Sequence, residues 1–233
     1  EISACLVGSE MCIRDRYWPA LFPANRIHEF MQDIMDTFPY LRRPDRSIVR
    51  QEEHLTGQIC KRLRPLRRYR EGPLEFHQES NLPDMNGRAD IRITCGQGID
   101  TDFIVEAKRL FLKRPNGRLN SLVAAYTGEE GMMRFVTGKY APYQQSSAML
   151  GYVYDIDLAE AQKKIASKID KCKKDLKLVQ SMQESTLLVQ PSIQETHRLL
   201  ENNRRFLVYH IFAKIPNAED ALDKKKPHLT ADF

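Results

Sequence analysis

The amino-acid sequence predicts an α/β domain built on a central mixed β-sheet that is flanked by helices. Three observations lead to this prediction. Short apolar segments with strand periodicity share the chain with segments whose apolar residues recur every three to four positions. Their order is helix, three strands, helices, strand, long helix and strands, an order typical of sheets covered by helices. The 233 residues are 42% hydrophobic, which is enough to bury a core.

Two helices are expected before the first strand. Apolar residues at helical spacing predict a helix over residues 25–38, and Pro44 lies in the break that follows. A second helix is predicted over residues 47–63, with Ser47 as its N-cap and Pro65 as the residue that stops it.

Strand patterns follow, and turn residues separate them. Asn, Asp, Gly and Pro cluster between the expected strands, so consecutive strands are predicted to form a meander. The three strands are expected over residues 74–79, 87–95 and 102–110.

The second half of the chain is predicted to alternate between helices and strands. The clearest helix covers residues 157–180, with Asp157 in a capping position at its start. The other expected elements are helices over residues 119–126 and 129–136 and strands over residues 148–154, 187–190 and 206–215.

The two ends of the chain are expected to lie outside the fold. The stretch CLVGSEMCIRDR, residues 5–16, resembles translated sequencing-adapter read-through and is a poor signal peptide. We therefore expect residues 1–16 to be a non-native extension, residues 17–223 to form a single domain, and residues 224–233 to be a frayed tail.

Composition restricts the classes of partner. A net charge of +5 permits a polyanionic partner without requiring one. The five cysteines show no C-x-x-C spacing, so reduced thiols and a cytoplasmic location are expected. The apolar stretches fall short of the roughly 18 residues of a membrane span, so no membrane partner is expected. No phosphate-loop or helical zinc motif occurs, which argues against a nucleotide cofactor or a histidine zinc site.

Strand alternation places three ionisable groups on one face of the expected sheet. Asp90 points away from Ala89 and Ile91 on the second strand. Glu106 and Lys108 project from the same side of the third strand, roughly 7 Å apart. Antiparallel pairing of the two strands would bring Asp90 beside them.

This combination suits phosphodiester hydrolysis. Mg²⁺ and similar hard cations prefer carboxylate oxygens and water. Such an ion polarises a phosphate and lowers the pKa of a bound water. A nearby lysine can orient or deprotonate that water, or stabilise the developing charge.

The same residues resemble a known signature. The segments GRADI, residues 87–91, and IVEAK, residues 104–108, are similar to the PD-(D/E)XK motif of the nuclease superfamily of that name, with alanine where the literal motif has proline. The resemblance covers about residues 47–155. It implies the restriction endonuclease-like three-layer fold, with a four-stranded mixed sheet between helices.

By this resemblance, Asp90 and Glu106 would be metal ligands and Lys108 the catalytic lysine. Many members also carry a glutamate on the helix before the meander, and Glu52 and Glu53 are the candidates here. Glu52 falls near the middle of the apolar stripe of the helix, whereas Glu53 lies roughly 100° away. A carboxylate on a core-facing stripe needs a partner or a metal. Glu52 is therefore preferred, and Glu53 is the alternative.

The sequence thus predicts a Mg²⁺- or Mn²⁺-dependent nuclease of DNA, in bacterial defence or DNA processing, with Glu52, Asp90 and Glu106 holding the metal. The alternative is a catalytically inactive nucleic-acid-binding or assembly module with the same fold. RNA is the other candidate substrate, and the oligomeric state is open, with a homodimer among the options.

Several further residues have two interpretations. Gln144 and Gln145 could lie near the site or belong to a polar loop. The basic run over residues 61–70 could contact phosphates, or could be a solvated helix end favoured by the helix dipole. The lysines between residues 163 and 177 are interpreted as the solvated face of the long helix.

Overall fold

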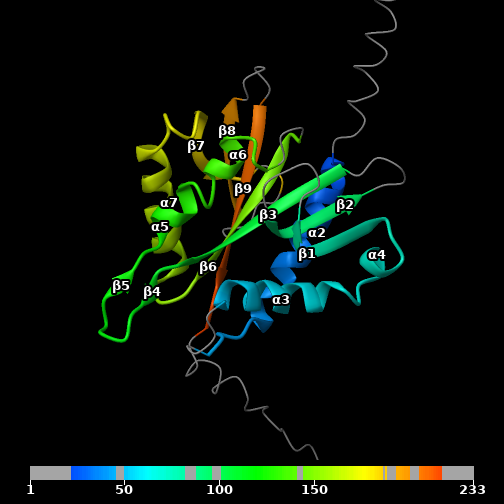
Figure 1. The fold of residues 1–233 in the computed structure, drawn as a ribbon, viewed down its shortest axis with the longest axis horizontal. Helices are drawn as coiled ribbons and strands as arrows, with labels where there is room; N and C mark the ends of the chain where they lie inside the picture. Colours follow the sequence, from blue (N-terminus) through cyan, green and yellow to red (C-terminus); the bar gives the residue numbers. More distant parts are fainter. Residues whose placement is uncertain are drawn as a thin grey trace, which may run out of the picture.

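A computed structural model describes residues 22–45, 50–81, 88–95, 101–140, 144–185, 187, 193–199 and 205–216. Its helices are α2 (Ala24–Asp36), η2 (Phe38–Tyr40), α3 (Gln51–Leu63), α4 (Arg67–Arg70), α5 (Val123–Thr127), α6 (Met133–Val136) and α7 (Leu158–Lys171). Its strands are β1 (Leu74–Asn81), β2 (Arg88–Cys95), β3 (Thr101–Leu110), β4 (Leu112–Lys113), β5 (Leu119–Asn120), β6 (Ser146–Val153), β7 (Leu178–Glu184), β8 (Ile193–Leu199) and β9 (Arg205–Lys214). Helices flank a strongly twisted sheet (Figure 1).

The sheet is mixed, as the sequence predicts. Within the described ranges its strand order is β1-β2-β3-β6-β9-β8-β7. The meander β1-β2-β3 is antiparallel, the central strands β3, β6 and β9 are parallel, and β8 and β7 return antiparallel. Strand β3 therefore joins the antiparallel part of the sheet to its parallel part.

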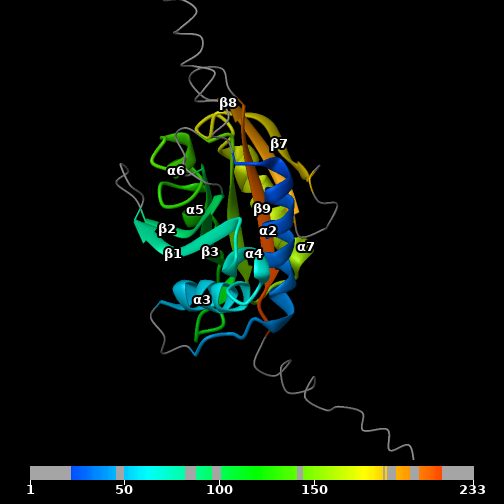
Figure 2. The ribbon, with the colours of Figure 1, turned by 90° about the vertical axis from the view of Figure 1, so that its right-hand side faces the viewer.

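Two apolar clusters lie on opposite faces of this sheet. The first cluster packs helices α2 and α3 against one face, with Phe30, Leu55 and Ile59 fully buried. The second packs α5, α6 and α7 against the other face, where Phe135 and Ile165 are fully buried. The resulting layers are helix, sheet and helix, and Figure 2 shows α2 and the pair α5–α6 on opposite sides of β6 and β9.

The early elements agree with the sequence prediction apart from their ends. Helix α2 ends at Asp36, where Thr37 begins the turn that leads into η2. Helix α3 begins at Gln51, while the expected N-cap Ser47 lies outside the described residues. The three strands of the meander and the later strands β6 and β9 lie where alternation and apolar content predict them.

The prediction of a helix reaching residue 180 is wrong. Helix α7 starts as expected, because Asp157 accepts a hydrogen bond from Ala159 N at 2.9 Å, but it ends at Lys171. Leu176 is buried in the turn that follows, and Val179 lies in β7 with 47% exposure. Strand β7 pairs with β8, and this ladder satisfies the backbone groups that a longer helix would have paired internally.

Two other expectations are corrected. The region predicted as helix over residues 119–126 begins with the short strand β5, paired with β4, before helix α5 starts at Val123. The region over residues 129–136 is a turn followed by the single-turn helix α6. Strand β8 was not predicted, and the strand expected over residues 187–190 falls almost entirely outside the described residues.

Among the helices of the described ranges, none has the length and apolar character needed to cross a membrane. Residues 1–16 and 224–233 lie outside the described residues.

Candidate functional site

Strand β3 carries two of the predicted site residues, Glu106 and Lys108. Val105 and Ala107 pack in the first apolar cluster and Ile104 packs in the second, so the alternation predicted for this strand is present. Glu106 is 1% exposed, and Lys108 Nζ donates a hydrogen bond to Glu106 Oε1. The strand therefore holds a buried carboxylate and an ammonium in direct contact.

Asp90 lies on β2 next to the end of the β2–β3 ladder. The antiparallel ladder between these strands begins at Ile91↔Val105. One residue before Ile91, the Asp90 Oδ2 atom accepts a hydrogen bond from the backbone N–H of Ala107 at 2.7 Å. Just beyond the last backbone pair of the ladder, the side chain of Asp90 therefore bonds the backbone N–H of Ala107 on β3. This contact fixes the Asp90 carboxylate beside the segment that carries Glu106 and Lys108.

The prediction that Ala89 shares a face with Ile91 and Ile93 is wrong. Ala89 packs in the second apolar cluster, whereas Ile91 and Ile93 pack in the first. In a regular strand, successive side chains point to opposite faces of the sheet. The ladder with β3 ends at Ile91, so among the described strands Ala89 is paired on one side alone, with Ser80 of β1.

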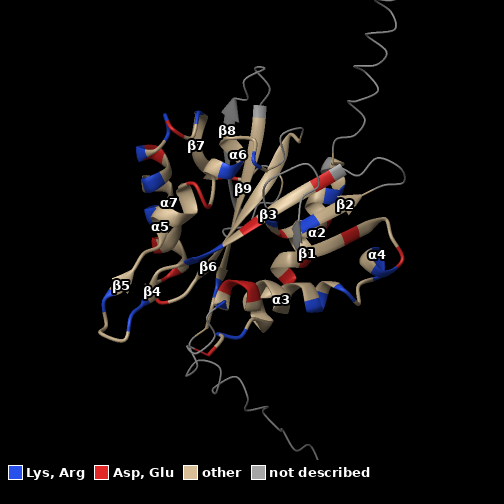
Figure 3. Cartoon of the chain, in the orientation of Figure 1, with Lys and Arg blue, Asp and Glu red and all other residues tan. Residues whose placement is uncertain are grey.

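Helix α3 brings Glu52 to the same place, and Figure 3 shows the acidic first turn of this helix near β3. Glu52 Oε2 accepts a hydrogen bond from the backbone N–H of Arg109 at 2.9 Å, and Glu52 Oε1 lies 3.7 Å from Lys108 Nζ. The alternative, Glu53, instead forms an ion pair with Arg50 at 3.1 Å. The structure therefore places Glu52 in contact with strand β3. We call Glu52, Asp90 and Glu106 the carboxylate cluster.

Helix α3 is held in this orientation by contacts on both sides of Glu52. One turn later, the Thr56 hydroxyl lies 2.9 Å from the hydroxyl of Tyr152 on β6, and both residues are buried. One residue earlier, Gln51 Oε1 accepts a hydrogen bond from the guanidinium of Arg109 at 3.3 Å. These contacts tie the first turn of α3 to the central strands and so fix the position of Glu52.

Burial raises the pKa values of the cluster. Desolvation, followed by repulsion from Asp90, raises the pKa of Glu106 to about 7, although Lys108 and Arg134 oppose the shift. Burial also raises the pKa values of Asp90 and Glu52, and Lys108 again opposes both shifts. Acidic groups that share a dry site favour a cation between them. The cluster is therefore electrostatically suited to bind positive charge.

Lys108 supplies part of that positive charge. Burial alone would lower the pKa of Lys108, but Glu106, Glu52 and Asp90 together raise it above its ordinary value. Lys108 is consequently an ammonium ion in this arrangement. In this state it can donate hydrogen bonds and stabilise negative charge, while it cannot accept a proton.

Sequence reasoning missed two neighbours of the cluster, Arg134 and Tyr140. Arg134 on α6 places Nη1 3.3 Å from Glu106 Oε1 and 3.5 Å from Oε2. The Tyr140 hydroxyl contacts the Arg134 guanidinium and donates to the carbonyl of Arg88. Neither residue has a motif to mark it, because only the packing of the segment 131–140 against the sheet brings them to Glu106.

The carboxylate cluster has the ligand types that a divalent cation prefers, but not the arrangement of a metal site. Three carboxylates are the ligands that Mg²⁺ and Mn²⁺ prefer. In the described part of the chain, however, no group of three or more Asp, Glu, His or Cys side chains is arranged to hold a metal ion. The cations of Lys108 and Arg134 contact the carboxylate of Glu106 instead. The carboxylate oxygens are suitable ligands for a hard metal. In the observed arrangement, however, the negative charge of Glu106 is compensated by Lys108 and Arg134.

The other candidates have contacts of their own. The carbonyl of Gln145 accepts a hydrogen bond from Leu207 N at 2.8 Å, which joins the start of β6 to β9. In the basic run over residues 61–70, Arg67 pairs with Glu71 at 2.7 Å and Arg68 pairs with Asp33 at 3.3 Å. These ion pairs neutralise part of the positive charge of the run, which favours a structural role for it.

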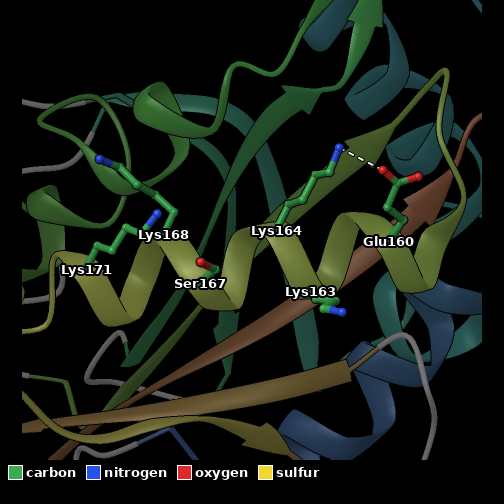
Figure 4. Close-up of a pocket in the computed structure, with 6 residues that line it drawn as sticks. All are labelled: Glu160, Lys163, Lys164, Ser167, Lys168 and Lys171. Atoms are coloured by element: carbon green, nitrogen blue, oxygen red, sulfur yellow. Dashed lines mark ion pairs between the residues drawn. The ribbon is translucent and has the colours of Figure 1, made fainter.

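Figure 4 shows lysines of α7, namely Lys163, Lys164, Lys168 and Lys171. Lys163, Lys164 and Lys171 are exposed on α7, as expected for the solvated side of an amphipathic helix. Lys173, Lys174 and Lys177, expected on the same helix, instead lie in the turn that follows it. Lys164 pairs with Glu160 at 2.7 Å and lies 5.8 Å from the ring centre of Phe111. A shallow surface pocket here is lined by Glu160, Lys163, Lys164, Ser167, Lys168 and Lys171.

Comparisons of this chain with protein-family models, curated proteins and solved structures found no match. The site is therefore characterised by the geometry of the carboxylate cluster and by the resemblance of residues 87–91 and 104–108 to the PD-(D/E)XK motif.

Proposed function

We propose that this protein is a metal-dependent nuclease with a restriction endonuclease-like fold, which hydrolyses phosphodiester bonds of DNA. One observation carries the proposal. Side chains from α3, β2 and β3, distant in sequence, converge as the carboxylate cluster around Lys108. Burying several ionisable groups together costs free energy of folding. Such clusters are found at functional sites.

Each residue has a defined part in this proposal. Glu52, Asp90 and Glu106 would hold Mg²⁺ or Mn²⁺, which when bound would polarise the phosphate and acidify a water. Lys108, an ammonium ion beside Glu106, would donate hydrogen bonds to the negative charge that develops on the phosphate. We place the reaction in the cytoplasm, where the thiols stay reduced.

The proposal is tested by incubating supercoiled plasmid DNA with the purified protein and Mg²⁺ or Mn²⁺. Cleavage is expected, and Lys108→Ala should lower its rate by about 100-fold or more, since a preorganised donor contributes that much to such reactions. The matched control is Lys113→Ala, which removes an exposed lysine on β4.

Circular dichroism and thermal unfolding will show that the variants are folded. Glu106→Gln, which keeps the shape of the side chain, should abolish cleavage as well. Plasmid cleavage by Lys108→Ala at the wild-type rate would contradict the role of Lys108. A wild-type protein that leaves DNA and RNA intact with every divalent cation would contradict the nuclease proposal.

The second candidate is a catalytically inactive module that binds nucleic acid or assembles with other proteins. It is favoured by the charge compensation of the site, in which Lys108 and Arg134 contact Glu106. This candidate predicts DNA or RNA binding in a gel-shift assay without divalent cations, unchanged by Glu106→Gln. A panel of single- and double-stranded DNA and RNA separates the substrate classes in the same assay.

A further inference from the structure

Glu106 is contacted by two cations from different parts of the fold. Lys108 approaches along the same strand, two residues away. Arg134 approaches from helix α6, and its Nη1 atom lies within 3.5 Å of both carboxylate oxygens of Glu106. The Arg134 side chain is 15% exposed and that of Glu106 is 1% exposed. Little water separates these charges from one another, so their attraction is only weakly screened.

We propose that Arg134 competes with a divalent cation for Glu106, so that metal loading requires the guanidinium to withdraw from this carboxylate. The inference depends on the proposed function, because it concerns the metal of the same site. A metal held by Glu106 would bring a divalent charge to a carboxylate that Lys108 and Arg134 already contact, and the guanidinium and the metal would repel each other there.

Arg134 has other partners that make this withdrawal feasible. Its Nη2 atom donates to Glu130, four residues earlier in the turn before α6, and the Glu130 side chain is 67% exposed. The hydroxyl of Tyr140 contacts Nη1 as well. The guanidinium would therefore keep a carboxylate and a hydroxyl when it left Glu106. Lys108 differs, because its Nζ atom contacts Glu106 Oε1 and lies 3.7 Å from Glu52 Oε1, so both of its ion-pair partners among the described residues belong to the cluster.

The test measures binding of Mn²⁺ alone by isothermal titration calorimetry on the full chain. Arg134→Gln should bind Mn²⁺ with a Kd roughly ten-fold lower than the wild type, since it removes the competing cation. The matched control is Lys139→Gln, which removes an exposed positive charge near Glu130. If only the overall charge matters, the two variants should change the Kd equally.

A second variant should act in the opposite direction. Glu130→Gln removes the outward partner of Arg134, so the guanidinium should bind Glu106 more firmly and the Kd for Mn²⁺ should rise several-fold. Glu129→Gln, at the adjacent exposed position, is its control and should change the Kd less. Glu106→Gln in each background identifies the portion of binding that occurs at this site.

The outcomes separate the inference from the proposed function. A lower Kd in Arg134→Gln, absent from Lys139→Gln, supports the inference. Equal Kd values for the wild type and Arg134→Gln overturn it and leave a metal-dependent nuclease intact. If neither protein binds Mn²⁺ in a manner that depends on Glu106, both the inference and the metal site are overturned. Unfolding curves recorded alongside establish that each variant is folded.

Discussion

At the scale of single residues, a buried histidine outside the carboxylate cluster makes the stability of the protein depend on pH. His210 on β9 is fully buried, and its Nδ1 atom lies 2.9 Å from the hydroxyl of Tyr126 on α5. Burial lowers the pKa of His210 to about 3, from an ordinary value of 6.5. The ring is therefore neutral in the folded protein at every pH near neutrality, and it serves the packing of the second apolar cluster.

The depressed pKa of His210 predicts a loss of stability in mild acid. Unfolding frees the ring to take up a proton below about pH 6.5, so the free energy of unfolding falls as the pH drops from about 6.5 towards 3. Between about pH 7.5 and about pH 5 this residue alone should account for about 2 kcal/mol. Urea unfolding at the two pH values measures the difference.

The variants His210→Phe and Tyr126→Phe isolate this effect. His210→Phe removes the titrating group and should lessen the pH dependence by about 2 kcal/mol, whatever its stability at neutral pH. Tyr126→Phe loses the hydrogen bond but keeps the buried histidine, so its pH dependence should persist. Identical pH dependence in His210→Phe and the wild type would show that the ring does not titrate as expected.

At the scale of elements, the tight turn between α5 and α6 determines where Arg134 lies. Gly131 N donates to Gly128 O at 2.9 Å, and Met132 N donates to Tyr126 O at 2.9 Å. A Cβ atom on Gly131 would overlap the carbonyl oxygen of Tyr126 and would lie 2.5 Å from that of Ala125. The close approach of backbone atoms leaves no room for a side chain, so only glycine permits this turn.

Gly131→Ala is expected to destabilise the protein by about 2 kcal/mol or more, because backbone rather than a flexible side chain must move. Gly57→Ala is the matched control. Its Cβ would lie 3.4 Å from the Gln78 side chain, an ordinary contact, and alanine favours helix α3 by about 0.5–1 kcal/mol. Urea unfolding should place the two variants on opposite sides of the wild type. Equal stability of Gly131→Ala and the wild type would contradict this account of the turn.

At the scale of the whole molecule, an ion pair joins segments that are 112 residues apart. Arg43, after η2, donates from Nη1 to Asp155 Oδ1 at 2.7 Å and from Nη2 to Oδ2 at 3.2 Å. The backbone N–H of Lys113 donates to the same carboxylate at 2.6 Å. Burial would raise the pKa of Asp155, but Arg43 and the Lys113 amide lower it overall. The pair thus connects the segment after α2 to the end of β6 and to the β4 strand.

Asp155→Asn should lower the free energy of unfolding by about 2 kcal/mol, because it leaves the Arg43 guanidinium, which is 15% exposed, without its counter-charge. The comparison variant Glu160→Gln breaks the exposed pair with Lys164 on α7 and should change stability by less than about 1 kcal/mol. Chemical denaturation measures both. If the two substitutions had equal effects, the long-range ion pair would contribute no more than a surface one.

Local sequence patterns predicted the strands of the meander well and the end of α7 poorly. Strands β1 and β2 alternate apolar and polar residues, β3 is rich in apolar residues, and turn residues separate the strands, so this information is local. The end of α7 is different, because Leu176 and Val179 continue the helical spacing although the chain has turned into β7. Only the ladder with β8 decides between helix and strand there, and spacing contains no information about that partner.

The sequence by itself determined the layered α/β plan and the candidate residues Asp90, Glu106 and Lys108, because alternation and periodicity group side chains by face, although Ala89 did not follow the alternation. It also gave a reason to prefer Glu52 over Glu53. The tertiary structure alone decided that Glu52 contacts β3, that Asp90 bonds the backbone of that strand, and that Arg134 reaches Glu106. The physical reason is that such contacts join elements far apart in the chain, and packing between layers sets their distance.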